Sequence, residues 1–368
     1  MARINFFGDF KVNKVENLNM SAELVYLLNT SDINVVNFEA PIKSTGASIK
    51  KSGPNISQHV DAPVWLEERG FNAVSLANNH IMDFGEIGLT KTKETFKSAT
   101  LMGAGCWDEA YKIHEFTTCD NLKIGIICCT HCEFGTLTDA NNKGAAYALN
   151  PEIQRLISKG NQFDALIIFN HGGVEYMDVP LPEWREMYKL WIDLGADAVI
   201  ASHPHVPQGY ELYKGKPICY SLGNFCFDSS KQDIPEHWYE SLCCTLYITS
   251  AHNVEMDIRP IIYDAENGYI KDNQDNNFYA HLESMNSVLH DKDVYMAHVN
   301  EGVVKLLAHY KGLFSRGGFV TGLFQKGFVK GFAEGFMGKG FWNYRHALNN
   351  IQCESHRWAI IRALNLKH

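Results

Sequence analysis

Residues 201–225 read ASHPHVPQGYELYKGKPICYSLGNF and place two histidines, His203 and His205, directly behind the apolar run ADAVIA (196–201). That run has the composition of a buried strand. Side chains alternate along extended backbone, so residues two apart project the same way, and Pro204 between them restricts the backbone. We therefore expect a strand that delivers two imidazoles to one edge of a sheet.

Similar apolar runs recur along the chain and alternate with helical patterns. We expect strands over residues 4–8, 33–39, 71–77, 123–130, 165–170, 196–201, 216–222, 242–250 and 254–263. We expect helices over residues 22–29, 62–70, 85–101, 150–160 and 181–195. This alternation favours the layered α/β class. From YSLGNF (220–225) to about Tyr263 no helical pattern intervenes, which suggests antiparallel strands that finish a sheet.

The composition changes near residue 270 and remains helical, aromatic and rich in glycine to the end. We therefore divide the chain of 368 residues into a domain over 1–270 and a helical extension over 271–368. Within the extension, residues 317–341 repeat glycine and phenylalanine at intervals of four, which gathers each type on one helix face. Such a helix could pack within the molecule or an oligomer, or lie at a membrane surface.

Composition and charge restrict the class of protein. The first residues show no leader pattern, and no apolar stretch reaches the roughly 18 to 20 residues that a spanning helix needs. We expect a soluble cytoplasmic protein whose ten cysteines are reduced, with a peripheral membrane location as the alternative. A net charge of -9 argues against broad nucleic-acid binding, which needs a basic surface.

Polar side chains close the predicted strands, at the edge where ligands bind in open α/β folds. They are Asp9, Asn37, Glu39, Asn78, Asn79, His80, Asp83, His171, Glu175, Tyr176, His203 and His205. Each alone is more often a cap, a turn former or a structural residue. Together they form the mixed oxygen and nitrogen set that binds divalent ions such as Mn, Fe, Zn or Co. We expect one or two such ions, with Mn, Fe or Zn favoured.

Three other features carry weaker predictions. The segment CCTHCEF (128–134) lacks a second ligand pair at zinc-finger spacing, and we interpret it as structural or incidental. Asn224 is expected to offer a polar contact at the floor of the site, and Glu175 and Tyr176 either face the substrate or begin a helix. The basic side chains of the last helix, Arg345, His346, His356 and Arg357, are interpreted as a solvated face.

The ordered blocks GD (8–9), NFEAP (37–41), LANNHIMDFGEIGL (76–89), NHGGVEY (170–176) and residues 195–228 resemble the CapA family. Those capsule and poly-gamma-glutamate biosynthesis proteins are related to calcineurin-like metallophosphoesterases. The resemblance covers about residues 1–262 and implies a four-layer α/β/β/α sandwich. It also implies a metal position held by Asp9, Glu39 and His205, and another completed by Asn79, His171 and His203. In this assignment Glu39 bridges the two.

The resemblance further implies that His80 protonates or steadies a leaving group while Asp83 orients it. One departure concerns Lys11, which stands where the wider superfamily usually has a histidine ligand. The position of Asp9 is therefore short of a ligand, and a single ion would be held by His203. We expect a metal-dependent hydrolase acting on an anionic polymer or a phosphoester. The alternatives are a scaffold without catalysis in a membrane-associated complex, and a phosphoesterase for a small substrate.

Overall fold

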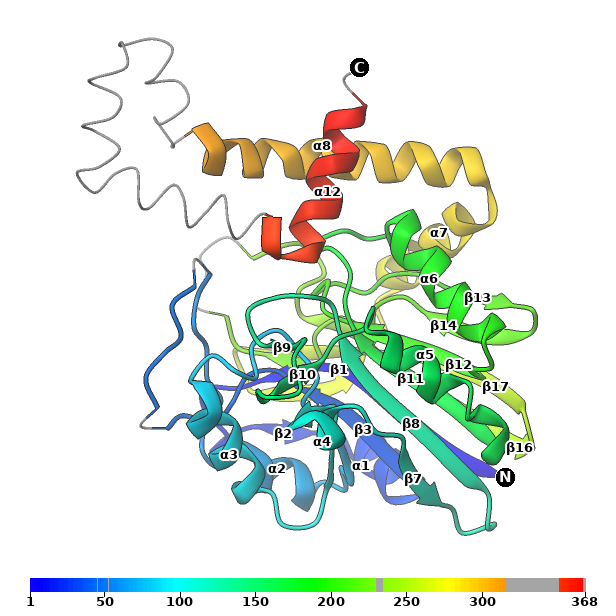
Figure 1. Cartoon of the computed structure of the whole chain (residues 1–368). Coiled ribbons are helices and arrows are strands. Elements are labelled where there is room, and N and C mark those ends of the chain that lie inside the picture. The colour runs from blue at the N-terminus through cyan, green and yellow to red at the C-terminus, as the bar shows by residue number, and fades with distance from the viewer. Residues whose placement is uncertain (45, 52, 230–233, 316–350, 367–368) are drawn as a thin grey trace.

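The computed structural model of the chain describes residues 1–44, 46–51, 53–229, 234–315 and 351–366. Two large sheets and one small sheet carry helices on their outer faces (Figure 1). The predicted α/β class is confirmed.

The nine-stranded sheet joins parallel strands near the start of the chain to antiparallel strands from beyond residue 239. Its order is β2-β18-β17-β16-β1-β3-β4-β5, and β15 pairs with β1. Its strands are β1 (Ala2–Lys11), β2 (Asn19–Met20), β3 (Ile33–Phe38), β4 (Ala73–Ser75), β5 (Thr100–Met102), β15 (Cys226–Phe227), β16 (Glu240–Ser250), β17 (Asn253–Asp264) and β18 (Tyr269–Asp272). Because β16 pairs antiparallel with β1 and β17, the predicted antiparallel completion of a sheet is confirmed.

The six-stranded sheet has the order β13-β14-β12-β11-β8-β7. Its four inner strands are parallel, and β7 and β13 run antiparallel at the two edges. Its strands are β7 (His114–Thr117), β8 (Lys123–Thr130), β11 (Ala165–His171), β12 (Ala198–Ser202), β13 (Tyr210–Tyr213) and β14 (Lys216–Cys219). A small sheet contains β6 (Ala104–Gly105), β9 (Thr136–Leu137) and β10 (Gly144–Ala146).

The two large sheets share a buried apolar core. Strand residues alternate between this core and the outer face, as in β11, where Ile167 and Phe169 face inward while Leu166 and Ile168 face outward. Across the core, the rings of Phe6 and Phe169 meet edge to face with centroids 5.4 Å apart. This packing fixes how far β1 lies from β11.

Helices cover the outer face of the nine-stranded sheet. These are α1 (Ala22–Asn29), α2 (Ala62–Glu68) and α3 (Gly85–Thr95). In α1, Leu24 and Leu28 are buried at a spacing of four, and the Ser21 hydroxyl accepts a hydrogen bond from the Leu24 N–H at the helix start. The short α4 (Trp107–Ala110) precedes β7.

The outer face of the six-stranded sheet is covered by helices from two parts of the chain. They are α5 (Pro151–Ile157), α6 (Pro182–Asp193), α7 (Asn276–His290), α8 (Lys292–Ser315) and α12 (Glu354–Asn365), and the 3-10 turn η1 (Gly160–Gln162) precedes β11. Tyr295 of α8 donates its hydroxyl to the carbonyl of Pro180 at 2.8 Å. The late helices therefore add to the core of this sheet, and α12 crosses α8 (Figure 1).

Two predictions about the late part of the chain stay open. The domain boundary near residue 270 stays a prediction. The glycine and phenylalanine repeat at 317–341 lies outside the described residues, as do Arg345 and His346. None of the helices in the described ranges is long and apolar enough to cross a membrane.

The predicted helix over 85–101 was too long. α3 ends at Thr95, and Phe96 takes an extended conformation with its ring against Phe38, with centroids 5.2 Å apart. Tertiary burial of that ring outweighs the helical pattern of the following residues. The chain then enters β5, which was not predicted.

We expect Gly8→Ala to destabilise the protein by about 1 to 3 kcal/mol, because a Cβ at Gly8 would collide with the carbonyl oxygen of Gly223. Urea unfolding measures this loss. Gly53→Ala is the control, because a Cβ there meets no atom within 4 Å. Equal midpoints for both variants would contradict the close approach of Gly8 to the backbone of Gly223.

Candidate metal centre

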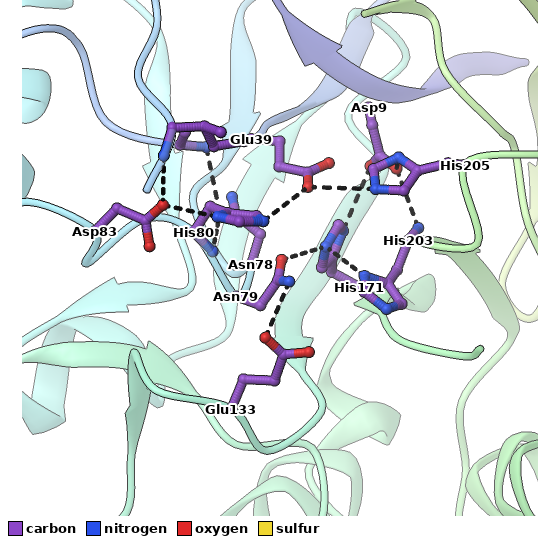
Figure 2. A network of polar contacts seen from close by, with 12 residues as sticks. Asp9, Glu39, Asn78, Asn79, His80, Asp83, Glu133, His171, His203 and His205 are labelled. Carbon is purple, nitrogen blue, oxygen red and sulfur yellow. Dashed lines mark hydrogen bonds and ion pairs between the residues drawn. The ribbon is translucent and has the colours of Figure 1, made fainter. Parts of the chain in front are cut away.

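The polar residues that close the strands meet where the two large sheets end side by side (Figure 2). Asp9 lies near the end of β1, and Glu39 directly follows β3. His171 is the last residue of β11, and His203 directly follows β12. Each sheet therefore supplies part of one buried cluster.

Asp9 is held from several sides and is fully buried. Its Oδ1 accepts a 2.7 Å hydrogen bond from the Asn37 amide, and its Oδ2 accepts one of 3.1 Å from the backbone N–H of His203. Burial opposes ionisation, but the neighbouring His171 and His205 outweigh it and lower the pKa of Asp9. Asp9 is therefore a carboxylate at neutral pH.

His171 lies between the two predicted metal positions. Its Nδ1 is 3.4 Å from Oδ1 of Asp9, and its Nε2 is 3.0 Å from Oδ1 of Asn79 and 3.2 Å from Nδ1 of His203. Burial lowers the pKa of both His171 and His203, which favours the neutral ring that a metal ligand needs. The buried Nε2 of His203 has no hydrogen-bond partner among the described residues.

Glu39 is completely buried, and neither of its oxygens accepts a hydrogen bond from the described part of the chain. Its Oε1 lies 3.7 Å from Nε2 of His205 and 4.0 Å from Nε2 of His80 (Figure 2). Burial, followed by the negative charge of Asp9, raises the pKa of Glu39. A buried carboxylate that accepts no hydrogen bond is costly, and a bound cation would remove that cost.

The donor set fits a divalent ion. Asp9, Glu39 and His171 offer ligand atoms that all lie within 4.8 Å of one another. Ligands bound at about 2.0 to 2.2 Å from one ion lie roughly 3 to 4 Å apart, so small movements would complete coordination. The carboxylate and imidazole donors suit Mn, Fe or Zn.

The backbone of the two opening histidines differs from the extended form that we predicted. His203 has φ 108° and His205 has φ 61°, backbone angles that residues other than glycine rarely adopt. Their ring centroids nevertheless lie only 5.9 Å apart. Since such conformations cost free energy, the surrounding contacts must hold both residues in place.

Aromatic side chains and an amide hold the His205 ring. Phe227 and Trp238 lie with ring centroids 5.0 and 5.1 Å from it, and its Nδ1 is 2.9 Å from Oδ1 of Asn224. The Asn224 amide nitrogen donates to the carbonyls of His205 and Trp238. The predicted substrate contact of Asn224 stays a prediction, whereas its contact with His205 is direct.

His80 points its Nε2 toward Glu39, and its other nitrogen contacts Asp83 (Figure 2). His80 Nδ1 lies 2.7 Å from Oδ2 of Asp83. Lys51 was not predicted to belong to the site, yet its ammonium pairs with Asp83 and lies 3.1 Å from His80 Nδ1. No strand ends at Lys51, so the pattern that revealed the other residues could not reveal it.

Glu133 and His131 were also missed. Oε2 of Glu133 accepts a 3.1 Å hydrogen bond from the Asn79 amide, which directs Oδ1 of Asn79 toward His171 (Figure 2). The His131 ring lies 4.3 Å from that of His203 between centroids. Both residues follow β8, whose end meets the same edge, so the strand-end signal used elsewhere could have found them.

Asn78 and Lys11 have supporting positions. Asn78 donates to the Phe38 carbonyl at 2.9 Å and accepts from the His80 backbone, so it shapes the turn rather than facing an ion. Lys11 turns to Asn13, at 2.6 Å, and to the carbonyl of Asp228. Lys11 thus supplies no ligand beside Asp9, in keeping with its side-chain chemistry.

A cavity of about 590 Å³ lies next to His205 and reaches α7 and α8. Glu175 and Tyr176 line it, and the Tyr176 ring lies 6.4 Å from that of His205 between centroids. Its remaining wall includes four carboxylate or lysine side chains and four histidines, which are Asp178, Glu236, Glu301, Lys305, His237, His281, His298 and His356.

Comparisons with known proteins agree with the ordered sequence blocks. The chain is 32% identical over 213 residues to the capsule biosynthesis protein CapA of Bacillus anthracis, covering 55% of this chain and 52% of that protein. It is 29% identical over 209 residues to the PGA biosynthesis protein CapA of Bacillus subtilis, covering 55% of each. A probable polyglutamine synthesis accessory protein of Mycobacterium tuberculosis is 25% identical over 221 residues, covering 56% of this chain and 58% of that one.

The matches to the two Bacillus proteins span about half of the length of those relatives. The family model described as bacterial capsule synthesis protein PGA_cap matches residues 9–229, a range that contains the predicted ligands from Asp9 to His205. That range is more than half of the chain, and the chain belongs to the PGA_cap family of bacterial capsule synthesis proteins.

Proposed function

We propose that the chain is a metal-dependent hydrolase that acts in the synthesis or processing of a capsular or poly-gamma-glutamate-type polymer. The observation that carries this proposal is the carboxylate of Glu39, which is buried without a hydrogen-bond partner in the described structure and faces imidazoles. A bound cation would remove the cost of burying such a group in its charged form. We further propose that the two sheets and their outer helices form the metallophosphoesterase sandwich.

The ligands divide into two positions in this proposal. Asp9, Glu39 and His205 would hold one ion, and Asn79, His171 and His203 would complete the other with Glu39. When bound, a divalent ion acidifies water and withdraws charge from a phosphoryl or carbonyl oxygen. The lowered pKa of His171 and of His203 supports a ligand role for both, because only a neutral imidazole binds a metal.

His80 is the proposed acid of the reaction. Asp83 contacts its Nδ1, and its Nε2 faces Glu39 and the space where a substrate would be bound. From there, Nε2 can protonate a leaving oxygen or nitrogen. Lys51 neutralises part of the charge of Asp83 and limits the movement of both side chains.

The substrate would enter through the cavity beside Tyr176 and Glu175. Two relatives are named for capsule or PGA biosynthesis, which supports a polymeric substrate. The proposed ligands are not among the cavity's lining residues, and the cavity adjoins them through Tyr176, whose ring lies beside that of His205.

The test is to purify the protein, determine its bound metals, and assay it with Mn²⁺ against poly-gamma-glutamate, phosphomonoesters and phosphodiesters. We expect bound metal and release of polymer fragments. Turnover of phosphoesters alone would assign a small substrate instead. A protein that takes up no Mn, Fe or Zn and hydrolyses none of these compounds would be a scaffold, and the proposal would fail.

Replacing the buried charge tests the metal requirement. We expect Glu39→Gln to raise the stability of the metal-free protein by about 1 to 3 kcal/mol at pH 7, because an uncharged amide costs less to bury than a carboxylate. The difference should shrink as the pH falls, since Glu39 has a raised pKa and then becomes neutral too. Urea unfolding in EDTA measures both effects.

The wild-type protein and Glu39→Gln should also differ in how strongly metal stabilises them. Mn²⁺ should raise the thermal midpoint of the wild-type protein and leave that of Glu39→Gln nearly unchanged. Equal stabilisation of both proteins by Mn²⁺ would show that Glu39 is not a ligand.

Removing the proposed acid should slow hydrolysis without removing metal. We expect His80→Ala to lower kcat by about 10² to 10⁴, with metal content unchanged. His290→Ala is the matched control, since His290 is exposed at the end of α7. An activity loss that follows metal loss instead would assign His80 to metal binding.

A further inference from the structure

A second group of metal-binding side chains lies behind Asn79, on the side away from Glu39. His131 and Glu133 follow β8, and Cys353 directly precedes α12. Oε1 of Glu133 lies 3.0 Å from Nε2 of His131 and 2.9 Å from Sγ of Cys353. These three ligand atoms all lie within 4.8 Å of one another, and His131 and Cys353 are buried.

We propose that His131, Glu133 and Cys353 bind a zinc ion, separate from the ions proposed at Glu39. A thiolate, an imidazole and a carboxylate are all established zinc donors, and the thiolate disfavours Mn²⁺ and Mg²⁺. Tetrahedral ligands at about 2.0 to 2.3 Å from zinc lie roughly 3.3 to 3.8 Å apart. The observed separations therefore need shifts below about 1 Å, with the fourth position open to water.

The hydrogen bonds within the cluster lie where zinc would replace protons. Zinc replaces two protons, the thiol proton that Cys353 donates to Glu133 and the proton between His131 and Glu133. Nδ1 of His131 lies 3.1 Å from the carbonyl of His171, which leaves Nε2 toward the cluster. Such a contact to the second ring nitrogen is typical of a histidine that binds a metal.

The zinc ion would join distant parts of the chain. Its ligand Cys353 begins α12, and the next residue, Glu354, exchanges hydrogen bonds of 3.1 Å with the backbone of Cys132. Through Oε2, Glu133 also holds the Asn79 amide. The proposed ion therefore fixes α12 to the loop after β8 and steadies a ligand of the neighbouring centre.

Cobalt substitution tests the proposal on the intact chain. Co²⁺ bound by a thiolate gives a near-ultraviolet sulfur-to-metal absorption that oxygen and nitrogen ligands alone do not give. We expect this absorption on titrating the metal-free, reduced wild-type protein with Co²⁺, and its loss on adding Zn²⁺ in excess over all the proposed metal positions. Its absence from the wild-type protein would overturn the proposal without any variant.

Variants then identify the thiolate. Cys353→Ser should abolish the cobalt absorption and lower the zinc content by one ion per chain. Cys132→Ser, in the loop that carries His131 and Glu133, should retain both. Persistence of the absorption in Cys353→Ser would assign it to another cysteine and sink the proposal. Asp9→Asn separates the two centres: it should keep the absorption even where it loses the metal proposed at Glu39.

Discussion

Charged and polar side chains are buried at the edge that the two large sheets share. The arrangement of the site depends on how these side chains are paired. Every buried polar atom there needs a partner, because an unpartnered one costs free energy that a marginally stable fold cannot spare. Asn37 shows how the chain meets this need, since its amide lies within hydrogen-bond distance of both Asp9 and His171, one from each sheet. The Glu39 carboxylate accepts no hydrogen bond from the described residues, so a cation would stabilise this group most.

The apolar core between the sheets sets the geometry of that edge. Asp9 belongs to the nine-stranded sheet and His171 to the six-stranded sheet, so their 3.4 Å separation depends on how the sheets pack. The contact of Phe6 with Phe169 lies between the same two strands, β1 and β11. Close packing leaves little freedom for sliding, and a volume change in this core would therefore alter ligand distances as well as stability.

The sequence was most informative where one local pattern decides the structure. Strand periodicity located most of the large-sheet strands, and polar residues at strand ends identified the cluster from Asp9 to His205. The sequence was least informative where tertiary contacts determine the local structure. At Phe96, for example, burial of the ring ends α3 earlier than the helical pattern predicts. Lys51 comes from a loop, and Glu133 lies in a segment whose cysteines suggest a zinc motif that their spacing does not complete. The positive φ of His203 and His205 likewise results from surrounding contacts, which no spacing rule contains.

The two hydrogen bonds between Cys132 and Glu354 have a consequence for folding during synthesis. These two residues are 222 positions apart, so the ribosome completes both large sheets before it adds α12. Domains tend to fold from the N-terminal side during synthesis. The nascent chain can thus assemble the edge with Asp9 and His171 while the wall beside Glu133 is still absent, and that side is open to solvent and ions until α12 docks.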